Sequence, residues 1–214
     1  MSCLNIWRQL MSEKTEPKIL WTGAKPWPGS PMVDFTQHCP HGQWISTDIE
    51  ASENDIKKDI PSLPSNSSSM AITKEGGNIA KIYKEDADVQ IVSDLETIDQ
   101  TTNLKFDGIF CTATLEHVKH PWVALKAMFN VMKEDGLLFI DTHHTFPIHG
   151  YPHDYFRFST EALKSMAIDA GFKVLLKEYQ FPCKIIPPRE VTRWNTVAES
   201  YLNTNICAHR EPDN

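Results

Sequence analysis

Long apolar segments are absent from this sequence. No run approaches the roughly 20 residues that a helix needs to span a bilayer, so we expect no membrane partner. The first fourteen residues contain neither an apolar core nor a small-residue cleavage site, so we expect no secretory leader there. Basic residues are outnumbered: the net charge is −7 at pH 7, and no basic stripe is present. This charge argues against nucleic acid as a partner.

Cysteine is scarce and scattered. The chain has five cysteines, an odd number, and no C-x-x-C pair. This usage indicates reduced thiols, as in a cytoplasmic protein, rather than a disulfide framework. With 214 residues, of which 41% are hydrophobic and 23% charged, the chain is long enough for one domain with a full core. The oligomeric state is not indicated, and a homodimer stays open.

We expect three regions along the chain. Residues 1–16 are interpreted as an N-terminal arm, which is either mobile or one short helix. Residues 17–210 are expected to form a single domain. Within it, the stretch from about 50 to 88 contains "PSLPSNSSS" and "KEGG", which are turn or linker signals, and we expect a low-order insert there.

Strand-like and helix-like segments alternate in the rest of the domain. Helices are expected from Pro121 to near Gly136, and from a cap at Ser159 or Thr160 to Ala170. Strands are expected at 18–22, 43–47, 89–93, 106–113, 137–140, 172–179 and 205–209. This alternation predicts an α/β fold with a mostly parallel sheet covered on both faces.

Small or acidic residues follow the predicted strands, where ligands bind in an open α/β sheet. One acid, Asp48, closes the second strand, and Glu50 is close behind. A carboxylate there is suited to accept both ribose hydroxyls of a nucleotide-like cofactor. The alternative is that Asp48 caps a helix. The full set of strand-end candidates is Gly23, Asp48, Asp94, Cys111 to Thr114, and Asp141 onward.

Residues 106–174 bear a family resemblance. The stretch contains an F-D-x-I strand, the motif L-E-H-V, an apolar strand and the segment H-x-x-P-x-D-Y-x-R-F. In this order they resemble the second half of a class I S-adenosylmethionine-dependent methyltransferase, closest to the methyltransferase type 11 subgroup. The resemblance implies a Rossmann-like, seven-stranded-type methyltransferase sheet in three α/β/α layers, with an altered N-terminal half. It also implies an enzyme with S-adenosyl-L-methionine as cofactor.

The resemblance assigns cofactor contacts to particular residues. Asp48 in "QWISTDIEA" matches the ribose-binding acid, and Asp94 in "IVSDLETI" matches the acid near the adenine amino group, with Asp59 as a rival. The other contacts that it implies are Gly23, Leu95, Thr112, Ala113 and His117. One departure is clear, because the family's G-x-G-x-G loop after the first strand is missing. A non-catalytic, methyltransferase-like binding protein is therefore an alternative.

The segment "DTHHTFPIHGYPHDYFRF", residues 141–158, would lie over the methyl end of that cofactor. Methyl transfer needs an aligned acceptor and usually a base for its proton, and histidine suits the second task. We expect catalytic roles for His149, His153, His144 and Arg157, with His149 ranked ahead of His153 as the base. Acceptor contacts are expected from His143, Tyr151, Asp154 and Tyr155.

Two other interpretations of this segment stay open. Asp141 and the four histidines offer enough ligands for a metal-dependent enzyme, although the spacing matches no strong metal signature, and we predict no metal. Alternatively, Arg157 pairs with Asp154 or Glu116 and only pins the loop. The leading hypothesis is methyl transfer from S-adenosylmethionine to an oxygen or nitrogen of a small-molecule acceptor.

Overall fold

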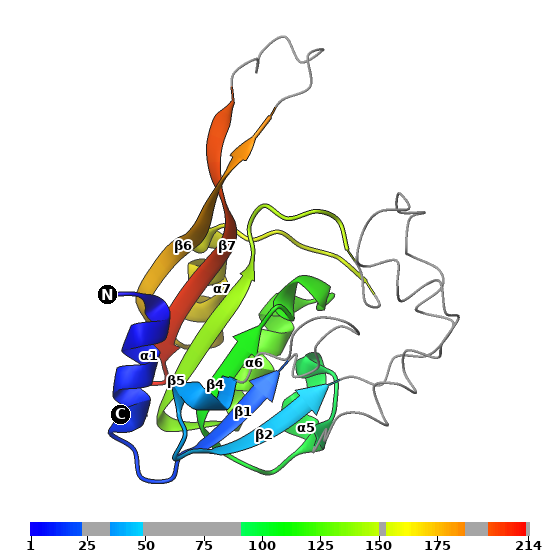
Figure 1. Ribbon diagram of the computed structural model, residues 1–214. Helices are drawn as coiled ribbons and strands as arrows, with labels where there is room; N and C mark the ends of the chain where they lie inside the picture. The colour runs from blue at the N-terminus through cyan, green and yellow to red at the C-terminus, as the bar shows by residue number, and fades with distance from the viewer. Residues whose placement is uncertain (23–34, 49–90, 150–152, 187–196, 213–214) are drawn as a thin grey trace, which may run out of the picture.

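A computed structural model describes residues 1–22, 35–48, 91–149, 153–186 and 197–212. Its centre is a seven-stranded sheet with the order β3-β2-β1-β4-β5-β7-β6 (Figure 1). The sheet is parallel from β3 to β5, whereas β7 runs antiparallel to both β5 and β6. The strands are β1 (Lys18–Thr22), β2 (Gln43–Asp48), β3 (Ile91–Val92), β4 (Phe106–Thr112), β5 (Met132–His143), β6 (Lys173–Ile185) and β7 (Ala198–His209). The predicted Rossmann-like, mostly parallel sheet is confirmed.

Helices pack on one face of the sheet, and the larger hydrophobic core lies between them and the strands. They are α5 (Ile98–Thr101), α6 (Pro121–Val131) and α7 (Thr160–Ala170), with the 3-10 turns η3 (Leu95–Thr97) and η4 (Leu115–His117). The predicted ends of α7 are confirmed. The Ser159 hydroxyl accepts a hydrogen bond from the Ala162 N–H at 3.1 Å, and Gly171 ends the helix at φ +112°, where a side chain would be strained.

The opposite face is covered by α1 (Cys3–Ser12) and by the 3-10 turn η1 (Phe35–His38). Trp7 is fully buried, and its ring lies edge-on to Phe110 of β4 at 5.1 Å. Gly108 makes this approach possible, since a Cβ there would lie 3.0 Å from the Met11 Cε and 3.3 Å from Trp7. Of the two alternatives for residues 1–16, the short helix is the one observed, and it is part of the core.

Two boundaries differ from the sequence prediction. Helix α6 ends at Val131 instead of near Gly136, because Met132 is already extended and pairs with Phe106 of β4. The "KEDG" residues therefore open β5. Strands β6 and β7 are also much longer than predicted, and Figure 1 shows them as a twisted two-stranded ribbon that continues beyond the rest of the sheet.

Three further expectations concern the chain as a whole. All five cysteines lie in the described part, and all are free thiols. Among the described residues, no helix is long and apolar enough to cross a membrane. The predicted low-order insert at about 50–88 lies outside the described residues.

Candidate active site

The topological switch point of the sheet lies between β1 and β4, since the chain runs outward from β1 to β3 and then returns to β4. At this edge, Thr22 pairs with Cys111. The backbone then turns at Ala113, whose φ is +45° and whose N–H donates to the Asp141 carbonyl of β5 at 2.9 Å. The Thr114 hydroxyl donates to the Thr112 carbonyl at 2.7 Å and receives the Thr22 hydroxyl at 3.4 Å. This edge is therefore polar, as expected for a ligand site.

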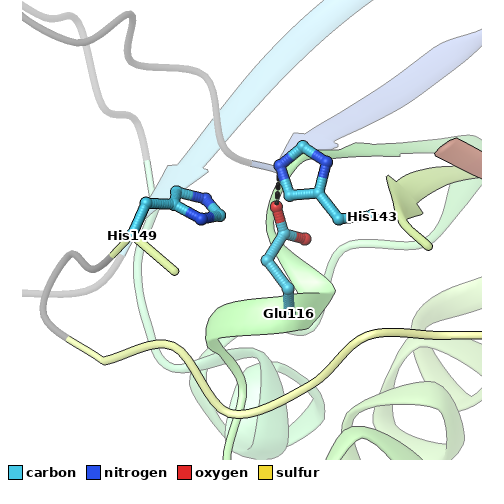
Figure 2. Close-up of side chains that lie close together, drawn as sticks. All are labelled: Glu116, His143 and His149. Carbon is cyan, nitrogen blue, oxygen red and sulfur yellow. Dashed lines mark ion pairs between the residues drawn. The ribbon is translucent and has the colours of Figure 1, made fainter. Parts of the chain in front are cut away.

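A buried carboxylate follows directly after this turn. Glu116 of η4 is 0% exposed, and its Oε2 accepts a hydrogen bond from the Thr142 hydroxyl at 2.7 Å. Its Oε1 lies 3.1 Å from His143 Nε2 (Figure 2). The same oxygen lies 3.8 Å from His117 Nε2. This oxygen has no hydrogen bond of acceptable geometry to any described residue. Burying a carboxylate oxygen without a hydrogen-bond partner costs free energy, so the groups around Oε1 indicate what it binds.

His143 is the last residue of β5, and contacts on several sides fix its ring. Its Nδ1 lies 3.3 Å from Asn203 Oδ1, and the Asn203 amide in turn donates to Asp141 at 2.8 Å. The ring stacks on Phe146 with 4.0 Å between centroids and 8° between planes. Burial lowers the pKa of His143, although the nearby Glu116 carboxylate opposes the shift.

His149 approaches the same carboxylate from the loop after β5 (Figure 2). Its ring lies edge-on to the rings of His143 and His117, at 5.0 and 4.9 Å between centroids. Burial lowers the pKa of His149, and the two neighbouring imidazoles lower it further. The predicted residues His143, His149 and His117 are thus brought together around Glu116.

Arg157 and Asp154 tie the loop to itself. The guanidinium donates to both Asp154 carboxylate oxygens, at 2.5 and 2.7 Å. It also donates to the carbonyls of Phe146, Phe156 and Pro147, at 3.1, 2.7 and 2.8 Å. Burial alone would raise the pKa of Asp154, but the Arg157 hydrogen bonds hold it below its ordinary value. These contacts engage all five guanidinium N–H groups, so they do not leave the fork free for an acceptor.

A family model described as a methyltransferase domain matches residues 30–177, more than half of the chain. The chain belongs to this methyltransferase family. The resemblance drawn from residues 106–174 is therefore confirmed, and with it S-adenosylmethionine as the methyl donor of the family.

Solved methyltransferases share the fold. A putative methyltransferase from Bacillus halodurans superposes with a TM-score of 0.56 at 15% identity, over 98% of this chain and 99% of that chain. An S-adenosylmethionine-dependent methyltransferase from Archaeoglobus fulgidus gives 0.56 at 15% identity, over 98% and 95%. A Burkholderia thailandensis 1,6-didemethyltoxoflavin-N1-methyltransferase with bound S-adenosylhomocysteine gives 0.54 at 13%, over 98% and 77%. At these identities the likeness concerns the fold alone.

One curated relative matches in sequence. The ubiquinone biosynthesis O-methyltransferase of Glaesserella parasuis is 34% identical over 117 residues, which is 52% of this methyltransferase chain. The match spans 43% of that relative's own length.

Two of the predicted cofactor residues, Asp48 and Asp94, lie at the end of β2 and just after β3. Asp48 ends β2 beside β1, and the hydroxyl of Thr47 next to it is buried with no hydrogen-bond partner among the described residues. Asp94 is exposed and caps η3 by accepting the Glu96 N–H at 2.9 Å. An acid at the end of β2, an exposed acid after β3 and an unused hydroxyl are acceptors that suit ribose hydroxyls and an amino group.

The other predicted cofactor residues have mixed surroundings. Thr112 and Ala113 lie at the switch point, and His117 Nδ1 lies 2.5 Å from the His153 carbonyl. The Leu95 side chain packs in the larger core. Gly23, the rival acid Asp59 and the predicted acceptor residue Tyr151 lie outside the described residues.

The rings of the other two loop histidines, His144 and His153, have partners other than Glu116. His144 Nδ1 lies 2.9 Å from the Phe158 carbonyl, and its ring packs on Tyr179 at 4.7 Å, so the structure does not bring this predicted catalytic residue into the cluster. The ring of His153 lies 5.3 Å from that of Tyr155.

Sequence reasoning missed the residues that organise the cluster. The sequence predicted Glu116 as part of the L-E-H-V motif of the resemblance and as a pairing partner of Arg157, and it did not predict a role for Thr142 or Asn203. The motif "LEH" directly after a buried strand was the available signal for Glu116. No local pattern pointed to Asn203, which comes from β7, 60 residues away from His143.

Proposed function

We propose that this methyltransferase moves the methyl group of S-adenosylmethionine to an oxygen or a nitrogen of a small-molecule acceptor. We further propose that the acceptor docks against the Glu116, His143 and His149 cluster. One observation supports this most directly: a buried carboxylate and two imidazoles converge at the carboxyl ends of β4 and β5, next to the switch point where we expect the cofactor to bind.

His149 is the residue to which we assign the acceptor's proton. Its lowered pKa keeps the ring neutral near pH 7, so a ring nitrogen is able to accept a proton. Bound S-adenosylmethionine supplies the electrophilic methyl group. The other residues orient and enclose the acceptor: the stacked rings of His143 and Phe146 offer it a flat face, and the Asp154–Arg157 pair holds the loop that bears His149.

Both acceptor atoms remain in the proposal. The curated relative is named as an O-methyltransferase and one structural neighbour as an N1-methyltransferase. A hydroxyl has to lose its proton before or during transfer, whereas a neutral amine attacks with its own lone pair. Dependence on His149 is therefore expected to be stronger for hydroxyl acceptors than for amines.

The test measures S-adenosylhomocysteine formation with a panel of hydroxylated aromatics and amines as acceptors. EDTA is present to remove metal ions, so that an imidazole has to act as the base. His149→Ala is expected to reduce turnover of hydroxyl acceptors by roughly 10²- to 10⁴-fold, with S-adenosylmethionine affinity by calorimetry within about twofold of wild type. His153→Ala is expected to cause a smaller loss.

His120→Ala is the matched control, because this histidine pairs with Glu96 at 2.8 Å and lies outside the trio. If His149→Ala and His153→Ala both turn over at the wild-type rate, the loop histidines are not the base. If the wild type neither binds S-adenosylmethionine nor releases its product with any acceptor, the proposed function itself is wrong.

A further inference from the structure

We propose that Glu116, His143 and His149 form a binding site for one divalent transition-metal ion of the Zn²⁺ class. Their ligand atoms all lie within 4.8 Å of one another (Figure 2). Two imidazole nitrogens and one carboxylate oxygen are a ligand set that Zn²⁺, Co²⁺ and Fe²⁺ accept, with further coordination positions left open. The site goes beyond methyl transfer and does not require it.

The tautomer of His143 leaves its Nε2 free to bind a metal ion. The Asn203 amide nitrogen donates to Asp141 at 2.8 Å, which turns the amide oxygen toward His143 Nδ1, at 3.3 Å. An amide oxygen only accepts, so Nδ1 has to carry the hydrogen. Neutral His143 then presents the bare lone pair of Nε2. A ligating histidine typically donates its other N–H to an oxygen partner in this way.

The orientation of Glu116 is the second argument. Oε2 is held by the Thr142 hydroxyl at 2.7 Å, and this bond directs Oε1 at His143 Nε2, 3.1 Å away. A carboxylate oxygen and a bare nitrogen are both acceptors, and at this distance they repel unless a cation or a proton joins them. Oε1 is fully buried and makes no hydrogen bond of acceptable geometry to the described residues. A metal ion would satisfy both atoms at once.

His149 supplies the third ligand from the loop. Its Nδ1 lies 3.2 Å from the Pro147 carbonyl and 3.4 Å from Arg157 Nη2. Because Arg157 Nη2 already donates to Pro147 and Asp154 at 2.8 and 2.7 Å, Nδ1 is assigned as the donor to Pro147, which leaves Nε2 for an ion. Ligand atoms bound at about 2.1 Å in a tetrahedron are roughly 3.4 Å apart. The ligand atoms of Glu116 and His143 are already near that spacing, at 3.1 Å. The ligand atoms of all three residues, with His149 included, lie up to 4.8 Å from one another. Loading therefore draws His149 inward by about 1.4 Å, the difference between 4.8 Å and the tetrahedral spacing.

Ligation has a consequence for the acceptor site. A metal uses the lone pair of His149 that a general base needs, so base and ligand are exclusive roles. In the loaded protein, an acceptor hydroxyl would bind the ion at an open position and lose its proton to solvent, because a bound cation lowers the pKa of an oxygen ligand. This last step alone rests on the proposed function.

The experiment is a titration of the metal-free protein with Zn²⁺ by calorimetry and with Co²⁺ by visible absorption. The wild type is expected to bind one equivalent and to develop the visible bands of Co²⁺ in a low-symmetry site of four or five ligands. His149→Ala and Glu116→Gln are each expected to weaken binding by about 100-fold or more, and Asn203→Ala by roughly 10- to 100-fold. His120→Ala, which breaks a histidine–glutamate pair outside the trio, is expected to bind as the wild type does.

Circular dichroism and thermal unfolding establish that each variant is folded before titration. His149→Ala changes a loop residue, so it tests the site even if the buried Glu116 variant fails to fold. The proposal is overturned if the wild type binds no metal, or if His149→Ala binds as tightly as the wild type. If the wild type binds no metal, a proton shared between Glu116 and His143 takes the place of the ion. If the protein binds one equivalent of metal but methyl transfer is unchanged in EDTA, the metal site exists and has no role in turnover.

Discussion

Substitution of Arg157 by lysine separates two roles that the loop segment allows. The first is a fork that binds an acceptor carboxylate, and the second is a residue that holds the loop in shape. The structure engages all five N–H groups of the guanidinium within the loop, on Asp154 and on three backbone carbonyls. A lysine ammonium keeps the charge but is a point donor, so it retains a contact with Asp154 and loses most of the carbonyl contacts.

The expected loss of stability follows from these contacts. Each of the three carbonyl hydrogen bonds contributes about 1 kcal/mol net, and partial exposure of Arg157 reduces the sum to about 2 kcal/mol. For a domain of this size, that corresponds to a fall in Tm of about 4 to 8 °C. Turnover is expected to fall as well, because a loosened loop no longer holds His149 near Glu116.

Urea denaturation and differential scanning calorimetry measure the stability, and S-adenosylhomocysteine release measures the turnover. Arg8→Lys on the exposed side of α1 is the control, with no change expected in either. A double-mutant cycle with Asp154→Asn is expected to give a coupling of roughly 1.5 to 3 kcal/mol. If Arg157→Lys abolishes turnover while the free energy of unfolding stays at the wild-type value, the Arg157 fork binds the acceptor and its role is not to hold the loop in shape.

Three other predictions test the cofactor edge, a buried acid and the first helix. S-adenosylmethionine at about 100 times its Kd is expected to stabilise the wild type by about 2.7 kcal/mol; Asp48→Ala is expected to remove most of that gain in a thermal-shift assay, and an equal shift in both proteins would contradict the ribose assignment. Burial raises the pKa of Asp141 to about 7 from its ordinary 3.8, so the folded protein keeps a proton that the unfolded chain loses. Its stabilising contribution is complete below about pH 4 and declines, by on the order of 1 kcal/mol per pH unit, as the pH rises to about 7. Asp141→Asn should flatten this decline in urea unfolding across that range, and parallel curves would argue against the shift. Trp7→Ala is expected to cost about 3 to 5 kcal/mol because the ring is fully buried; a loss below about 1 kcal/mol would mean that α1 is not part of the folding unit.

The parts of the fold that were predictable are those whose signals are local. Short apolar runs such as "KILWT" specify strands because a parallel sheet buries both faces, and β1 has the predicted bounds. Serine before α7 and glycine after it act through their own backbone and side-chain geometry. The end of α6 was not predictable in this way. Lysine and glutamate in "KEDG" favour a helix, but pairing of Met132 with Phe106 in the sheet overrides that preference.

The candidate site shows the same limit more strongly. The predicted histidines are adjacent in the sequence, yet β5 continues to His143, and a strand directs successive side chains to opposite faces. His143 therefore meets Glu116, whereas the next residue, His144, packs on Tyr179. Had the strand been predicted to extend three residues further than Ile140, this separation would have followed from the sequence alone.

What the sequence could not reveal is which acid the histidines share. Asp141 and Asp154 are the acids within the loop segment, but neither lies at the centre of the trio. Asp141 is bound by the Asn203 amide, and Asp154 is bound by Arg157. Glu116 fills that position because parallel pairing of β4 with β5 brings the turn after β4 beside Thr142. The chemistry of this loop is therefore determined by a neighbouring strand, and a test that changes only loop histidines would miss the carboxylate on which they converge.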